Sequence, residues 1–101
     1  MKYILIIITL LATSLLAKDY IVDQKGKTFI PHELFLKVGD TITFTNSDPI
    51  SHNAYTDDEG NEFDIGMQAT GEKITVEIKA TGKFDIECAI HPNMLLEVTV
   101  N

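Results

Sequence analysis

The residues most capable of chemistry gather near the end of the chain, in the stretch CAIHPNM. This stretch holds Cys88, His91 and Met94, with two residues between each and the next. A thiolate, an imidazole and a thioether are all metal ligands of soft or borderline character. A second histidine, His52, follows a turn far upstream. The four side chains could form one metal site if the fold brings the two segments together.

The ligand types narrow the choice of metal. Structural zinc sites are built from cysteine, histidine and carboxylate ligands, whereas two histidines and a cysteine with a weak axial methionine are typical of an electron-transfer copper site. The set predicts one copper ion per chain, held by His52, Cys88, His91 and Met94. It leaves no evident open position for a substrate, so it favours an electron carrier over an enzyme.

Each candidate ligand also has a plainer interpretation. His52 could be a surface histidine, Cys88 an inert buried thiol, and Met94 a core residue, since buried free cysteine is common. Two other residues could compete: His32 is interpreted as a surface or structural residue, and Met67 as a second-choice axial donor. The acidic loop at 57–62 lacks the spacing of a twelve-residue calcium loop and is interpreted as a solvated loop.

The elements that must position these donors are predicted to be β-strands. Polar and apolar residues alternate in runs separated by Gly, Pro, Asn and Asp. The runs are 20–22, 34–38, 42–44, 63–65, 74–78, 84–88 and 94–100. They predict an all-β fold, a Greek-key sandwich or barrel of about seven to eight strands. Cys88 and Met94 should face inward at one pole, with His91 in the loop between them.

The N-terminal residues have the order of a secretory signal. A basic start at Lys2 precedes an apolar run of 14 residues (3–16) and the small residue Ala17. The run is short for a membrane span, which needs about 20 residues. We predict a signal peptide at 1–17, a single domain at 18–101, a periplasmic location and no stable membrane insertion after cleavage. A retained N-terminal anchor is the alternative.

Charge and cysteine content limit the partners and the redox chemistry. The 101-residue chain has a net charge of −7, and all its basic residues are lysines. Such a balance argues against nucleic acid and anionic lipid as partners. With one cysteine, the chain cannot form an internal disulfide, and a free thiol in an oxidising compartment needs protection. A bound metal would protect the thiol and stabilise a small domain.

On these motifs the sequence resembles the small cupredoxins, or type 1 blue copper proteins, which include plastocyanin, pseudoazurin and amicyanin. The resemblance rests on FLKVGDTITFTNSD (35–48), SHN (51–53) and CAIHPNM (88–94). It implies that His52, Cys88 and His91 are in-plane copper ligands and Met94 the axial one. It also implies that Asn53 ties the two ligand-bearing segments together by hydrogen bonds.

One position departs from the short-loop members of that family. Ile90 stands where amicyanin and plastocyanin loops carry proline, so it keeps a backbone N–H. We expect this N–H to point at the Cys88 sulfur, where it would raise the reduction potential.

The resemblance implies a monomeric periplasmic electron carrier. Its expected partner is a transient redox protein, such as a c-type cytochrome or a redox enzyme. The alternative is a copper-handling protein that stores or delivers the metal. A catalytic copper enzyme is disfavoured, because three histidines are too few for a further copper centre.

Overall fold

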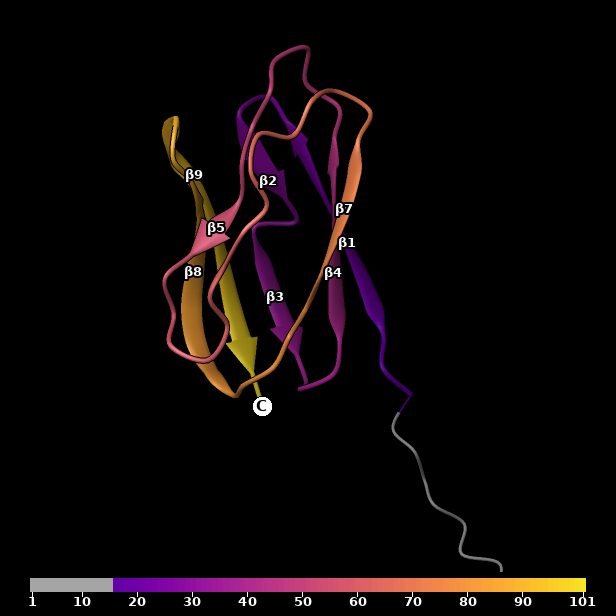
Figure 1. The fold of residues 1–101 in the computed structure, drawn as a ribbon, viewed down its shortest axis with the longest axis vertical. Coiled ribbons are helices and arrows are strands. Elements are labelled where there is room, and N and C mark those ends of the chain that lie inside the picture. The colour runs from indigo at the N-terminus through magenta and orange to yellow at the C-terminus, as the bar shows by residue number, and fades with distance from the viewer. Residues whose placement is uncertain (1–15) are drawn as a thin grey trace, which may run out of the picture.

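The computed structural model describes residues 16–101, and these residues form nine β-strands in two layers (Figure 1). The strands are β1 (Asp19–Lys25), β2 (Thr28–Ile30), β3 (Glu33–Leu36), β4 (Thr41–Asn46), β5 (Tyr55–Thr56), β6 (Phe63–Asp64), β7 (Lys73–Glu77), β8 (Gly82–Cys88) and β9 (His91–Val100). The predicted all-β class is confirmed. The described part of the chain contains no helix that could cross a membrane. The predicted signal peptide falls almost wholly outside the described residues.

The strands form two sheets that face each other across the core. One sheet has the order β2-β1-β4-β7, and the other has the order β3-β9-β8-β5-β6. Most neighbours are antiparallel, but β1 pairs with β4 in parallel, and β3 pairs with β9 in parallel. The chain therefore crosses repeatedly between the sheets, as a Greek-key sandwich requires.

Burial follows the alternation seen in the sequence. In β4, Ile42 and Phe44 are fully buried, while the threonines between them lie on the outer face. The ring of Phe44 packs against Phe29 and Phe63, with centroid distances of 6.3 and 6.1 Å. In β8 and β9 the inward positions include Cys88 and Met94, at 1% and 0% exposure. Both inward-facing predictions are confirmed.

The β8–β9 connection is shorter than the sequence suggested. Cys88 is the last residue of β8 and pairs with His91, the first residue of β9, so the turn contains only Ala89 and Ile90. His91 was expected in the loop, but this pairing places it in the strand. The register shifts between Glu87 and Cys88, because residues 92–94 of β9 have no partner on β8. This bulge lies at the opposite end of the sandwich from Asn101 (Figure 1).

Candidate metal centre

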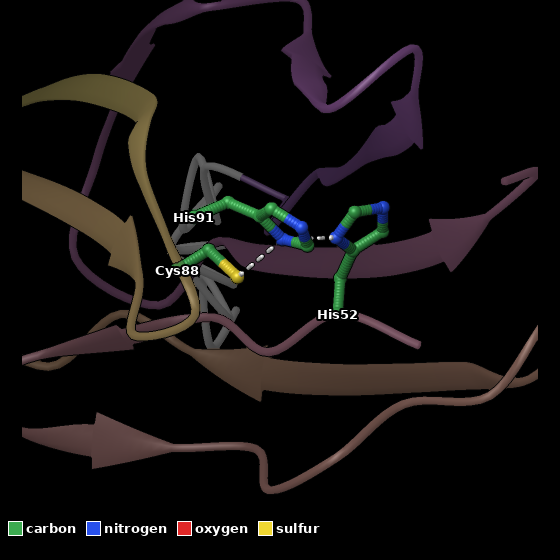
Figure 2. Close-up of side chains that lie close together, drawn as sticks. All are labelled: His52, Cys88 and His91. Carbon is green, nitrogen blue, oxygen red and sulfur yellow. Dashed lines mark hydrogen bonds between the residues drawn. The ribbon is translucent and has the colours of Figure 1, made fainter. Parts of the chain in front are cut away.

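Three of the four predicted ligands meet at the β8–β9 end of the sandwich (Figure 2). The potential ligand atoms of His52, Cys88 and His91 all lie within 4.8 Å of one another. His52 Nδ1 is 3.1 Å from His91 Nδ1, which is 3.7 Å from Cys88 Sγ. His52 and Cys88 are buried and His91 is half-buried. The site is closed on its inner side and approachable through His91.

Backbone pairing fixes each of these residues independently of a metal. Cys88 and His91 are held opposite each other by the β8–β9 pairing. His52 is held by a two-way bridge to Gln68, in which His52 N donates to Gln68 O at 3.1 Å and Gln68 N donates to His52 O at 2.7 Å. The side-chain amide of Asn46 donates to Gln68 O and Ile50 O, which fixes the segment that leads to His52.

Asn53 connects the His52 segment to the cysteine segment. Its backbone N–H donates to Cys88 Sγ at 3.5 Å, and its Oδ1 accepts a hydrogen bond from Ala89 N at 2.7 Å. Among residues 16–101, Cys88 Sγ is contacted by Asn53 N and His91 Nδ1. The bond expected from Ile90 N is not among them. Hydrogen bonds to the sulfur lower its electron density, so Asn53 is placed to tune a bound metal.

Asp48 holds the buried ring of His52 from the other side. Its Oδ2 lies 2.6 Å from His52 Nε2 and accepts the backbone N–H of Lys27 at 3.0 Å, while its Oδ1 accepts that of Gly26 at 2.6 Å. A carboxylate can only accept, so Nε2 carries the hydrogen and Nδ1 presents a lone pair to the centre. The sequence analysis interpreted Asp48 only as part of a strand-ending turn. The signal available was an acid four residues before the histidine.

The donor set fits a soft or borderline cation. Because His52 Nδ1 is an acceptor, His91 Nδ1 must carry the hydrogen that joins the two rings in the metal-free protein. Coordination through these atoms would need the His91 hydrogen on Nε2 in place of Nδ1, and the Cys88 thiol would have to lose its proton. Two imidazole nitrogens and one thiolate around a point are the in-plane ligands of an electron-transfer copper site.

The remaining candidate ligands differ in how exposed their side chains are. Met94 is fully buried in the unpaired part of β9, three residues after His91, and its role as axial ligand stays a prediction. Met67 is 59% exposed, which makes it a poor alternative. His32 is exposed just before β3, and its carbonyl pairs with the N–H of Glu97, far along β9 from the ligand turn. His32 is therefore a surface residue away from the site, which agrees with the sequence analysis.

A two-sheet β-sandwich with a buried histidine and cysteine and a half-buried histidine at one end defines a small metal-binding cupredoxin. Residues 18–101 match the family of copper binding proteins, plastocyanin/azurin family. The chain belongs to this family, and copper is the metal that its site holds.

Individual relatives agree with the family assignment. The chain is 36% identical to the methylamine utilization protein MauL of Methylophilus methylotrophus over 72% of its own length, and it spans 44% of MauL. It is 29% identical to a chloroplast plastocyanin of Hordeum vulgare, over 91% of this chain and 68% of that protein. The match thus spans less than half of MauL.

Solved structures show the same fold. A reduced Cu(I) form of an amicyanin variant at pH 4 superposes with a TM-score of 0.73 at 27% identity, over 82% of both chains. A copper-containing nitrite reductase from Thermus scotoductus SA-01 gives a TM-score of 0.74 at 26% identity. That match covers 82% of this chain and only 22% of the enzyme.

The bonds around Asp48 predict a pH dependence of stability. The Lys27 amide, with help from His52 and Gly26, lowers the pKa of Asp48 from 3.8 to about 2, although burial acts in the opposite direction. A carboxyl with a lower pKa in the folded state stabilises the fold above its unfolded pKa and loses this effect as pH falls. The free energy of unfolding of the metal-free protein should therefore fall between about pH 4 and pH 2.

Urea unfolding at several pH values tests this expectation. The decline should be smaller in Asp48→Asn, which has no carboxyl to titrate at this position. Asp19→Asn is the control, because the Asp19 carboxylate is exposed and accepts only the hydroxyls of Thr41 and Thr43. Parallel pH profiles for the wild-type protein and Asp48→Asn would contradict the assignment.

Proposed function

We propose that this protein carries electrons on one copper ion bound by His52, Cys88 and His91, with Met94 as the axial ligand. The observation that carries the proposal is the closed, prepositioned donor set, whose three central atoms lie within 4.8 Å of one another. Backbone pairing and buried hydrogen bonds hold the ligands, so they move little when the copper charge changes. Small movement means a small reorganisation cost, which favours rapid electron transfer.

Electrons would enter and leave through His91, the half-buried ligand. Exposed Ala89, Ile90 and Pro92 adjoin His91 in the chain, and Ile50 lies two residues before His52; Ile50 and Ile90 are 39% and 51% exposed, and we expect the four side chains to form one apolar patch. This apolar surface beside a redox centre suits brief docking, since electron-transfer encounters bury little area. The partner we propose is a c-type cytochrome or a redox enzyme, which the protein meets as a monomer.

We further propose that residues 1–17 are a signal peptide and that 18–101 is the exported domain, located in the periplasm. The basic start, apolar run and Ala17 support this division. The proposed domain is also the part of the chain that matches the copper-binding family model.

A copper-handling role is the second candidate, because storage and delivery could use the same ligands. The buried positions of His52 and Cys88 favour retention of the metal over its transfer. An enzymatic role has less support, because the chain corresponds to a small part of the nitrite reductase and has three histidines in all.

Redox cycling of the copper-loaded protein tests the carrier role. We expect intense blue thiolate-to-copper absorption in the Cu(II) form, reversible loss and return of that band on reduction and reoxidation, and no release of metal. Cys88→Ser should lose the blue band while the fold persists. Release of copper on each reduction would instead support copper handling.

Replacement of the methionines tests the axial ligand. Met94→Leu should raise the reduction potential, because the thioether lost from the site stabilises Cu(II) more than Cu(I). Met67→Leu is the matched control, since Met67 is 59% exposed. An unchanged potential in Met94→Leu would mean that Met94 serves only the core.

The acidic surface predicts a salt effect on electron exchange. A net charge of −7 should attract a positively charged partner and accelerate encounter at low ionic strength. Stopped-flow exchange with a cationic c-type cytochrome should slow as salt rises, because the added ions screen this attraction. A rate independent of salt would remove the steering role of the negative charge.

A further inference from the structure

A buried carboxylate lies at the pole of the sandwich opposite the metal centre. Asp40, in the turn between β3 and β4, is only 5% exposed. Its Oδ1 accepts the backbone N–H of Lys18 at 3.0 Å, and its Oδ2 accepts that of Lys37 at 2.8 Å. These two amides lower the pKa of Asp40 against the effect of burial, so the group is charged at neutral pH.

The backbone of Lys18 is fixed on both sides. Its nitrogen lies on the Asp40 carboxylate, and its carbonyl accepts the N–H of Thr41 at 2.9 Å. The next residue, Asp19, begins β1 opposite Thr41 of β4. The two described residues before it are unpaired: Leu16 is 83% exposed, and Ala17 is exposed as well. Lys18 is therefore the residue at which the described chain joins the sandwich.

The close contacts of the Asp40 carboxylate are with neutral groups. Within residues 16–101, no lysine ammonium lies within 4.0 Å of its carboxylate, and the one close acid–base pair joins His52 to Asp48. Lys18 and Lys37 contribute only longer-range attraction. Neutral amide donors and distant lysines thus stabilise the charge, and a cation at the position of Lys18 N would add a direct ionic contact.

We propose that Asp40 is the receptor for the α-ammonium group of a chain that begins at Lys18. Hydrolysis of the Ala17–Lys18 bond adds one water: Ala17 keeps a carboxylate, and the Lys18 nitrogen becomes an ammonium. A peptidase of the signal-peptidase class supplies the cleavage. The hydrogen bond from the neutral amide to the carboxylate, at 3.0 Å, then becomes a buried ion pair at the same atoms. This inference rests on the proposed export of the chain.

The simpler role for Asp40 is to close its turn. Lys37 N binds Oδ2 alone, so an asparagine oxygen could satisfy that bond without a buried charge. The other oxygen, Oδ1, accepts from Lys18 N, so the negative charge of the carboxylate lies next to that nitrogen. Removal of the leader thus gives the processed fold an ionic contact that the precursor lacks.

The test begins with the full-length gene exported from a bacterial host. We expect intact-mass analysis and N-terminal sequencing of the product to show a chain that starts at Lys18. In the Cu(I) form, an NMR titration of the Lys18 Cα should then report an α-amine pKa above the usual range. The expected increase in proton affinity is about tenfold.

Matched variants separate the ion pair from other effects. Asp40→Asn should return the α-amine to its ordinary proton affinity. Asp19→Asn should not, because the Asp19 carboxylate accepts the hydroxyls of Thr41 and Thr43 and does not contact Lys18 N. If Asp40→Asn does not fold, a chain that starts at Ala17 keeps Asp40 but moves the amine away, and it should likewise lose the raised affinity.

Two outcomes would overturn the proposal. One is an exported product that begins at another residue, and the other is an α-amine affinity that is the same with and without Asp40. If the chain is not exported, the export proposal fails. The role of Asp40 can then still be tested by the same α-amine titration on a chain cut after Ala17 at an engineered protease site. β9 separates this pole from the ligand turn by 10 residues, about 30 Å of strand, so the copper spectrum should be unchanged in all variants.

Discussion

The structure depends on the pairing of Cys88 with His91 across a two-residue turn. This pairing sets a thiol and an imidazole side by side at the end of the core, and His52 must then approach from a different connection between strands. His52 Nδ1 and His91 Nδ1 lie 3.1 Å apart at this point. A copper ion between these nitrogens and the Cys88 sulfur would offset the mutual repulsion of their lone pairs and the negative charge of the thiolate. A bound metal should therefore stabilise the folded state at this end of the sandwich.

Buried polar groups hold the converging segments, and each connects two parts of the chain. Asp48 joins the His52 ring to the β1–β2 hairpin through Gly26 and Lys27. Asn53 joins the His52 segment to the turn after Cys88. Such groups are costly to bury unless their hydrogen bonds are satisfied, so they favour a single arrangement of the loops. The centre can then be shaped before the metal arrives, which suits an ion that must change charge without moving its ligands.

The two poles of the sandwich have different tasks. The ligand pole combines a half-buried histidine with the exposed apolar side chains Ile50 and Ile90, as a site of brief electron exchange requires. The other pole secures the first residue of the fold through Asp40. The strands between them keep a change at the chain start remote from the copper ligands.

Much of the fold could be predicted from the sequence, because alternation along a strand depends on local residues alone. The runs at 42–44 and 84–88 identified β4 and β8, and the inward positions of Cys88 and Met94 followed from period two. The parallel pairing of β1 with β4 could not be predicted this way, since it depends on how distant segments pack.

Within the site, the sequence indicated which residues converge, and its resemblance to the cupredoxins implied the linking role of Asn53, but the contact from Asp48 was not predicted. The contact between Asp48 and His52 was missed because an aspartate after a strand is common in turns. Its residue type alone does not show that it also holds a ligand. The early start of β9 was missed because strand register is a tertiary property. The sulfur contact expected from Ile90 is made by Asn53 instead, since the direction of a turn amide cannot be read from residue types.

X-ray absorption at the copper edge of the loaded protein tests the central claim most directly. The account predicts one short copper–sulfur distance and two nitrogen scatterers with imidazole character, with little change between Cu(II) and Cu(I). The same sample of Cys88→Ser should lose the short sulfur shell. A first shell of nitrogen and oxygen alone in the wild-type protein would contradict the claim that His52, Cys88 and His91 bind one copper ion.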